Sequence, residues 1–337
     1  MRVMIIGESR KKLNEGYTKI AYSLKEHIKK AEHDVVLVSR KDVLKPKFFQ
    51  FYKKFNPDIV HYITAPTLSS LLVLKLIKSL DPEVKVVASA LHPYSLKLFG
   101  NNSSLRRKIL EKVRPDLMLI QTKRLEALLT RLSIPYAYLP NGVDIDVFMP
   151  VSKKKKKELR EKYGISPEKT VILHVGHIKP ERNLHTLIDI KKLLKDSVEG
   201  LVVASDYFGV NKEIYHSLLK NNIKIITKYI PNIEEVYQLA DIYIFPTRKE
   251  GSIFMPLSVL EAMACNLPVI TTPFDGLLTY FKEGNGIFYA DSPENFLLFV
   301  KQLLENNIDV KTRDFVIKYS WDNVITRLLN LYKNLLE

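Results

Sequence analysis

The stretch ADIYIFPTRKEGSIFMPLSVLEAMACNLPVITT, residues 240–272, decides the fold of this chain. Its β-branched run Ile242–Phe245 predicts a buried strand, and a loop follows this strand as far as Pro256. Pro256 favours the first turn of a helix, which leads to a second strand at Val269–Thr272. Loops at strand ends bind ligands, and the amides at the start of such a helix can bind a diphosphate.

Glu261 lies inside this predicted helix, about one and a half turns from its start. A carboxylate at this place can accept hydrogen bonds from the hydroxyls of a sugar. The alternative is an ordinary ion pair with a neighbouring Lys or Arg. The residues alone leave both interpretations open.

The alternation of short β-branched runs with helical periods extends along the whole chain and predicts two series of βαβ units. The first series has strands near 3–7, 35–38, 59–63, 84–90, 117–121 and 136–139, and the second near 171–176, 201–204, 223–227, 242–245, 269–272 and 286–289. Such strands form parallel sheets that are buried on both faces. The predicted class is α/β, with two parallel-sheet domains and a ligand in the cleft between their strand ends.

A cluster of turn-forming residues, Pro140–Asp144, separates the two series, and we expect the domain boundary near residue 148. The first domain is then 1–148 and the second 149–321. Apolar periodicity predicts helices at 293–305, 310–320 and 322–336. The segment 322–337 is a candidate for packing back on the first domain.

The composition excludes several classes of protein. With 337 residues, 46% of them hydrophobic and 26% charged, the chain is typical of globular proteins and unlike disordered or collagenous ones. No apolar run approaches the ~20 residues of a membrane span. The N-terminus lacks the apolar core and cleavage site of a signal peptide, so we expect a cytoplasmic protein. The single cysteine, Cys265, can form neither an internal disulfide nor a multi-cysteine zinc site.

The net charge of +15 is distributed unevenly. Residues 1–150 contain 26 Lys and Arg against 14 Asp and Glu, a balance of +12, whereas residues 151–337 carry +3. A cationic half is typical of a protein that faces the phosphates of nucleic acid, anionic lipid or a charged acceptor. A lysine-rich thermophile surface is the alternative. No helix-turn-helix, zinc-finger or RNA-binding motif supports nucleic acid as the partner.

One basic stretch is also rich in aromatic residues. Between Lys45 and Phe55, four lysines interleave with five aromatic side chains. This composition suits the interface of an anionic membrane, with Phe48, Phe49 and Phe51 inserting below the headgroups. An amphipathic helix packed on the sheet would give much of the same pattern. Peripheral attachment to the inner face of the membrane is therefore one of two open interpretations.

Specific motifs resemble a known family. Pro256–Ala264, followed by Leu267–Ile270, resembles the donor-site signature of the family-4 retaining glycosyltransferases, enzymes of the group 1 type with the GT-B fold. Further matches occur in order at Pro57–His61, Leu139–Asp144, Val171–Asn183 and Tyr319–Trp321. The resemblance spans nearly the whole chain. It implies two Rossmann-like parallel-sheet domains facing across a cleft, the first for the acceptor and the second for the nucleotide-sugar donor.

The resemblance implies donor-binding roles in the second domain. The family's glutamate in the segment Glu-Ala-Met-Ala binds the donor's ribose, and here this residue is Glu261. The family's basic pair contacts the diphosphate, and the matching positions are His177 and Arg182. His177 would be mostly neutral at pH 7, so stabilisation of the diphosphate would depend on Arg182 and the helix amides. Asn183 stands where the family usually has glycine.

The resemblance also implies catalytic residues, namely His92, Arg182 and Glu250. The family spaces two glutamates by seven intervening residues, but Ile253 occupies the first of these positions here. Glu250 is the nearest acid, with ten residues between it and Glu261. His92 stands where a family histidine contacts the transferred sugar; a solvent-facing loop histidine is the alternative.

Backbone contacts with the donor are implied at two further places. The first is Ile253, Phe254 and Met255, just before the donor-site helix. The second is Gly16, which would allow the N-terminal loop to approach the diphosphate closely.

The implied function is transfer of a sugar from a nucleotide-sugar to a lipid-linked or other cell-envelope glycan acceptor, with retention of configuration. No acidic metal pair stands out, so we expect neither a metal nor a cofactor. The alternatives are a nucleotide-sugar epimerase or phosphorylase on the same fold, and a non-catalytic glycan- or lipid-binding relative. The phosphorylase cofactor-lysine motif is not apparent. The expected partners are the nucleotide-sugar, the acceptor and, as an option, an anionic membrane surface, but not nucleic acid.

Overall fold

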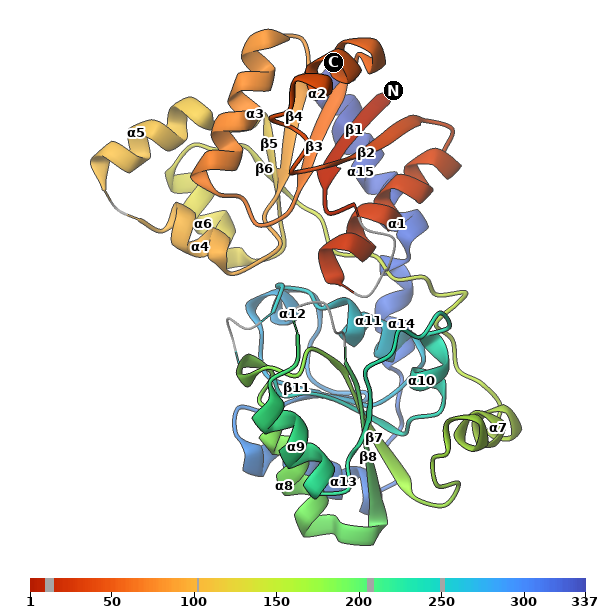
Figure 1. The fold of residues 1–337 in the computed structure, drawn as a ribbon. Helices are drawn as coiled ribbons and strands as arrows, with labels where there is room; N and C mark the ends of the chain where they lie inside the picture. The colour runs from red at the N-terminus through yellow and green to blue at the C-terminus, as the bar shows by residue number, and fades with distance from the viewer. Residues whose placement is uncertain (10–14, 102, 205–208, 249–251) are drawn as a thin grey trace. The chain divides into compact units, whose positions relative to one another are not determined.

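The computed structural model describes residues 1–9, 15–101, 103–204, 209–248 and 252–337, and their contacts define two units (Figure 1). Unit 1 comprises Met1–Gly142, Ile253–Met255 and Trp321–Glu337. Unit 2 comprises Val143–Ser252 and Pro256–Ser320. Each unit is built around one parallel β-sheet.

The sheet of unit 1 has the strand order β2-β1-β3-β4-β5-β6, with every neighbouring pair parallel. Its strands are β1 Arg2–Gly7, β2 Asp34–Ser39, β3 Ile59–Ile63, β4 Lys85–Ser89, β5 Leu117–Ile120 and β6 Tyr136–Tyr138. The chain runs outward from β1 to β2 and then crosses back to β3, so the strand order reverses between β1 and β3. Ligands of open α/β sheets bind at such a reversal, outside the carboxyl ends of the strands.

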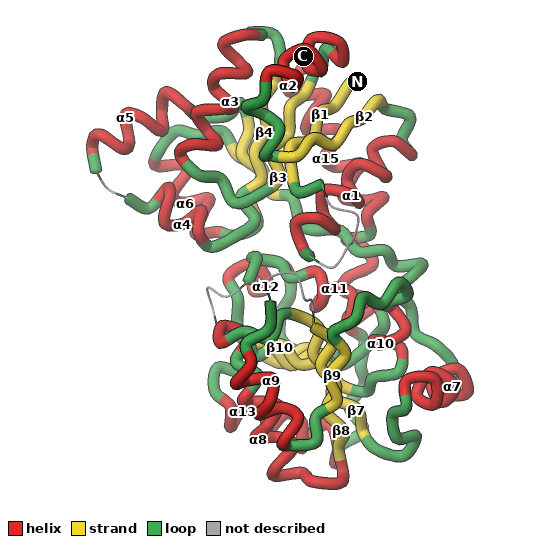
Figure 2. The backbone as a smooth tube through the Cα atoms, viewed as in Figure 1, coloured by secondary structure: helices red, strands yellow, loops and turns green. Residues whose placement is uncertain are grey.

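Helices cover both faces of this sheet (Figure 2). They are α1 Gly16–Lys30, α2 Pro46–Phe55, α3 Leu68–Leu80, α4 Tyr94–Phe99, α5 Ser104–Val113, α6 Lys123–Arg131 and α15 Trp321–Leu336. Helices α1 and α15 pack against each other. Helices α2, α3, α5 and α6 bury apolar residues in one common core with the strands.

The sheet of unit 2 has the strand order β9-β8-β7-β10-β11-β12, again entirely parallel. Its strands are β7 Thr170–Gly176, β8 Val198–Ala204, β9 Lys224–Ile226, β10 Ile242–Phe245, β11 Val269–Thr271 and β12 Ile287–Tyr289. The chain builds outward from β7 to β9 and then returns to β10. The reversal therefore lies between β7 and β10, where the general rule places a ligand.

Unit 2 also has helices on both faces of its sheet. They are α7 Lys153–Tyr163, η1 Pro180–Arg182, α8 His185–Leu194, η2 Lys195–Ser197, α9 Lys212–Lys220, α10 Glu234–Gln238, α11 Leu257–Ala264, α12 Asp275–Tyr280, α13 Pro293–Glu305, α14 Thr312–Val316 and η3 Ile317–Tyr319. Helices α8, α9 and α13 share one core with the sheet. Helix α11 contacts α10, α14, β10 and β11.

The predicted α/β class with two parallel-sheet domains is confirmed, and the twelve expected strands occur within a few residues of their expected bounds. The helix expected at 310–320 is shorter, because α14 ends at Val316 and a 3-10 turn, η3, follows it.

The contacts divide the chain between Gly142 and Val143, six residues before the expected boundary. The Val143 amide donates to the Tyr319 carbonyl (3.0 Å). The Arg313 guanidinium donates to the carbonyl oxygens of Ile145 (2.9 Å) and Phe148 (2.8 Å). These hydrogen bonds join 143–148 to unit 2.

Helix α2 is an amphipathic helix that packs on its sheet. Phe48 and Tyr52 are only 4% and 8% exposed and belong to the core of unit 1. The prediction that Phe48 inserts into a membrane is therefore wrong, because its side chain is already buried in the protein. Phe51 is 42% exposed. Of the helices in the described parts of the chain, none combines the length and the apolarity needed to cross a bilayer.

Candidate functional site

The loops that follow β7 and β10 meet at the reversal point of unit 2. After β7 the chain forms η1, which ends at Arg182, and after β10 it reaches Thr247, which is fully buried. The Arg248 amide donates to the Glu181 carbonyl (2.8 Å), so the two loops are joined. Asn183 follows η1 with φ +48°, a left-handed conformation that asparagine adopts more readily than most residues.

Arg182 is held at this point by a weak hydrogen bond and an aromatic ring. Its Nη1 donates to Thr247 Oγ1 (3.3 Å), and its Cζ lies 5.3 Å from the centroid of the Phe245 ring. Burial lowers the pKa of Arg182, although a guanidinium remains a cation at neutral pH. No carboxylate of the described residues forms an ion pair with it within 4.0 Å. A half-buried guanidinium of this kind can bind a phosphate through two parallel hydrogen bonds.

Glu261 lies on α11 and is 6% exposed. The hydroxyl of Tyr237, on α10, donates to its Oε2 (2.6 Å). The Tyr237 ring lies 5.9 Å from that of Tyr243, which in turn lies 6.4 Å from the Phe245 ring that Arg182 contacts. One row of aromatic rings therefore connects Glu261 to Arg182.

His174, on β7, is completely buried beside this arginine. Its Nδ1 lies 3.0 Å from the Ile244 carbonyl, so Nδ1 carries the proton that is donated, and the ring stacks on Phe245 at 5.7 Å. Burial lowers the pKa of His174 to about 3, which keeps the ring neutral. A Cβ at Gly176 would lie 2.9 Å from His174 Nε2, so only glycine fits at this position without displacing the ring.

Two of the donor residues expected in the second domain, Arg182 and Glu261, are thus connected through Tyr237, Tyr243 and Phe245. His177 is half-buried in the loop between β7 and η1. Glu250 lies outside the described residues.

The segment Ile253–Met255 belongs to unit 1 although it precedes α11 in the sequence. Phe254 is 3% exposed and packs in the core of unit 1, and its amide donates to the Leu91 carbonyl (2.9 Å). Ile253 Cδ1 would lie 3.8 Å from a Cβ at Gly16. The structure therefore brings Gly16 and this segment together, next to the residue that precedes His92.

A buried amide network holds the end of this segment. Asn141 Nδ2 donates to the Met255 carbonyl (2.7 Å), and Asn141 Oδ1 accepts from Gln121 Nε2 (2.9 Å). His92 is half-buried, and its Nδ1 accepts from the Tyr94 amide (3.3 Å). The Phe254 amide, which we expected to face a donor, is engaged within unit 1.

The site also contains four residues that were not expected from the sequence, namely Tyr237, Tyr243, Thr247 and His174. The available signal was the type of residue, because a buried tyrosine needs a hydrogen-bond partner for its hydroxyl. The Tyr237–Glu261 pair was not apparent, since 24 positions separate the two residues.

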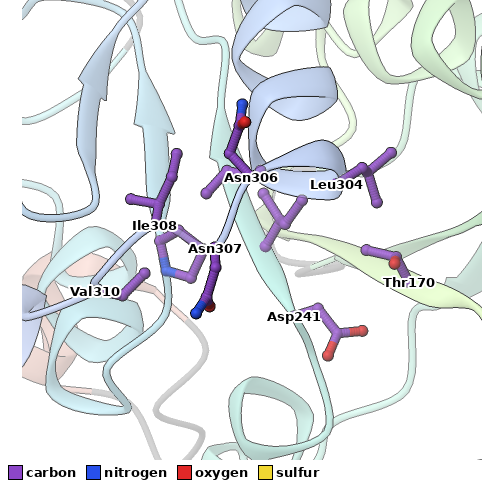
Figure 3. A pocket seen from close by; sticks show the side chains of 10 residues that line it. Thr170, Asp241, Leu304, Asn306, Asn307, Ile308 and Val310 are labelled. Carbon is purple, nitrogen blue, oxygen red and sulfur yellow. The ribbon is translucent and has the colours of Figure 1, made fainter.

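A cavity of about 330 Å³ lies at the other end of the same strands, next to their amino ends (Figure 3). Its lining includes Thr170, which begins β7, Asp241, just before β10, and Asn306 after α13. The Asp241 carboxylate accepts from the Val171 amide (2.7 Å) and pairs with Lys156 (2.6 Å) and Arg160. These groups hold the amino ends of the strands together, so the cavity is separate from the candidate site.

The described residues contain no group of three or more His, Cys, Asp and Glu side chains arranged to hold a metal ion. That the protein needs no metal ion therefore stays a prediction.

Comparison with known proteins identifies the family of residues 155–320. Residues 155–320 match the family model of the glycosyl transferases group 1, and this range includes Arg182 and Glu261. The uncharacterized glycosyltransferase MJ1607 of Methanocaldococcus jannaschii is 26% identical over 213 residues, 58% of this chain and 53% of that protein.

A second relative has a defined activity. The UDP-Gal:alpha-D-GlcNAc-diphosphoundecaprenol alpha-1,3-galactosyltransferase of Escherichia coli is 29% identical over 148 residues, 41% of this chain and 36% of that protein. The matches span 53%, 39% and 34% of the length of the first three curated relatives, about half or less.

Solved structures share the fold over the full length. HepE of Anabaena in complex with UDP-glucose has a TM-score of 0.76 at 14% identity, covering 99% of this chain and 100% of that one. Sucrose-phosphate synthase of Thermosynechococcus elongatus has a TM-score of 0.79 at 16% identity, with 99% of both chains covered. These likenesses concern the fold, and they confirm the expected GT-B type. Residues 155–320, which match its model, thus form a domain of the glycosyl transferases group 1 family.

Proposed function

We propose that this protein is a retaining glycosyltransferase that moves a sugar from a nucleotide-sugar to a lipid-linked or other cell-envelope glycan acceptor. One observation supports this most directly: Arg182, a half-buried cation that forms no ion pair with a carboxylate of the described residues, is connected to Glu261 by the row of rings Phe245, Tyr243 and Tyr237. The Escherichia coli relative, named for a UDP-Gal donor and a diphosphoundecaprenol acceptor, supports the substrate classes.

Each group has a distinct role in donor binding. Arg182 binds the diphosphate through its guanidinium, and the amides at the start of α11, which begins at Leu257, add hydrogen bonds to the same anion. Glu261 accepts hydrogen bonds from the ribose hydroxyls. Together these contacts would select a nucleoside diphosphate rather than a free sugar.

In the transfer, the bond between the sugar C1 and the diphosphate oxygen breaks while the acceptor hydroxyl oxygen forms a bond to C1 on the same face. The acceptor proton passes to the departing phosphate oxygen. Negative charge grows on the diphosphate in the transition state, where Arg182 and the α11 amides stabilise it. We propose that the reaction needs no metal ion.

Assays with a panel of UDP-, GDP- and ADP-sugars test this function. We expect the protein to consume at least one of them, by hydrolysis or by transfer to a lipid-linked glycan acceptor, with release of the nucleoside diphosphate. Proton NMR of the product reports the anomeric configuration. An inverted product would refute retention, and failure to bind or consume any member of the panel would refute the proposed activity.

We further propose that unit 1 docks on an anionic membrane through helices α2 and α3. Residues 42–81 contain six lysines and three acidic residues, and two of the lysines, Lys45 and Lys78, pair with Asp42 and Asp116. Five apolar side chains of this region are exposed: Leu44 (70%), Phe51 (42%), Leu72 (49%), Leu76 (46%) and Leu80 (62%). The Tyr52 hydroxyl of α2 donates to Asp81, which caps α3, so the two helices lie on the same side of the sheet. Basic and apolar side chains on one side are complementary to anionic lipid.

A further inference from the structure

Tyr237 contacts Glu261 from a position that the family's motif does not include. It lies on α10, is completely buried, and donates from its hydroxyl to Glu261 Oε2 at 2.6 Å. Hydrogen bonds to a charged carboxylate are shorter and about twice as strong as those between neutral groups. The contact is therefore a strong constraint on the Glu261 side chain.

The Tyr237 ring is itself fixed by two aromatic neighbours. Phe148 packs on it edge to face with 5.6 Å between ring centroids, and Tyr243 lies at 5.9 Å. Burial and the Glu261 charge raise the pKa of Tyr237 well above its usual value. The hydroxyl thus keeps its proton and acts only as a donor toward the carboxylate.

We propose that Tyr237 is a positioning residue that sets the preference of this site for ribose over deoxyribose; this inference rests on the proposed role of Glu261 in donor binding. A carboxylate on a flexible side chain can turn away from a ligand. The bond from Tyr237 to Oε2 fixes the rotamer and the plane of the Glu261 carboxylate, so the direction of Oε1 is set before a ligand arrives. Preorganised groups bind more tightly because less ordering remains to be done on binding.

Calorimetry with ribose and deoxyribose nucleotides tests the proposal. The probes are UDP, GDP and ADP, each paired with its 2′-deoxy form, and the protein is the full chain. For the nucleotide that binds best, we expect wild type to prefer the ribose form about tenfold or more. Tyr237→Phe should reduce this preference to about threefold or less, and Glu261→Gln should nearly abolish it.

Tyr163→Phe is the matched control. The Tyr163 hydroxyl also donates to a carboxylate of unit 2, Glu235 Oε2, at 2.7 Å. This variant loses a part-buried hydrogen bond to a carboxylate other than Glu261, so its ribose preference should equal that of wild type. A purely structural role for Tyr237 would lower stability without changing the ratio of the two affinities.

The outcomes separate the two proposals. If wild type prefers ribose and Glu261→Gln loses this preference while Tyr237→Phe keeps it, the positioning role is wrong and the role of Glu261 stands. If wild type shows no preference, both are wrong. If Tyr237→Phe does not fold, Phe148→Leu replaces it, because this variant loosens the Tyr237 ring and leaves the hydroxyl. An unchanged ratio in Phe148→Leu would then overturn the inference.

Discussion

The Tyr332 hydroxyl lies 2.6 Å from His61 Nδ1, although 271 positions separate the two residues in the chain. Both side chains are completely buried, and the other ring nitrogen of His61 lies 2.7 Å from Ser89 Oγ. One imidazole therefore links helix α15 to strands β3 and β4. This link helps to attach the end of the chain to unit 1.

Tyr332→Phe should destabilise unit 1 by about 1–3 kcal/mol, because it leaves a buried imidazole nitrogen without its partner. Urea unfolding followed by circular dichroism measures the change. Tyr229→Phe, at a position that is 41% exposed, is the control and should stay within about 0.5 kcal/mol of wild type. Equal stability of Tyr332→Phe and wild type would contradict the proposed attachment of α15.

The stability of the protein should fall as the pH falls below about 6.5. Burial lowers the pKa of His61 and of His174 to about 3, whereas an unfolded histidine titrates near 6.5. Between these values the unfolded state binds more protons, so acid favours unfolding by up to about 1.4 kcal/mol per pH unit for each histidine. Above a pH of about 6.5 both rings are neutral in the folded and in the unfolded protein, so the protein keeps its full stability there.

Urea titrations at pH 7.5, 6.0 and 5.0 measure this slope. In His174→Gln one titrating ring is absent, so the slope should be about half as steep over the same range if the two histidines dominate. A slope identical to that of wild type would show that His174 does not supply the pH dependence.

The fold was predictable because parallel strands buried on both faces leave continuous β-branched runs in the sequence. Ile59–Ile63 and Ile242–Phe245 were expected at the bounds that the structure has. Every residue of both strands is buried, which is the physical origin of the pattern.

Other features could not be predicted, since they depend on long-range packing. In α2, lysines interleave with aromatic residues, and the same pattern serves a membrane interface or a core-facing helix. Only the structure shows that Phe48 is buried and Phe51 is exposed. Likewise, nothing in the local sequence indicates that Phe254 packs in the core of unit 1, because its partner Leu91 is remote in the chain.

Arg182→Ala should weaken binding of a nucleoside diphosphate by about tenfold or more, while the affinity for the corresponding nucleoside changes little. The reason is that only the diphosphate has the anionic oxygens that the guanidinium binds. Calorimetry with UDP and uridine, or with the pair that wild type prefers, measures both affinities. Arg107→Ala, whose side chain is 55% exposed on unit 1, is the control. Equal losses for both ligands would indicate a structural role for Arg182.

Binding of the protein to anionic vesicles should fall steeply as salt increases. Each lysine near an anionic surface contributes about 1 kcal/mol, and this attraction is screened beyond a Debye length of about 10 Å at 0.1 M salt. Replacing Lys47, Lys53 and Lys54 by Glu should abolish binding, because all three side chains are exposed. Lys47 lies in the first turn of α2, and Lys53 and Lys54 lie in its last turn. Sedimentation with anionic and with neutral vesicles at several salt concentrations is the measurement.

A matched variant and two apolar substitutions complete this test. Replacing Lys153, Lys154 and Lys157 of α7 by Glu makes the same change in net charge on unit 2 and should leave vesicle binding intact. Phe51→Ser and Leu76→Ser remove exposed apolar side chains without opening the core, so they should weaken binding to vesicles. Binding to nucleic acid would also depend on salt, but it would not depend on these two residues inserting into lipid. If the protein stays in the supernatant with both kinds of vesicle at low salt, the membrane proposal is wrong and the charge of +12 in residues 1–150 reflects surface composition.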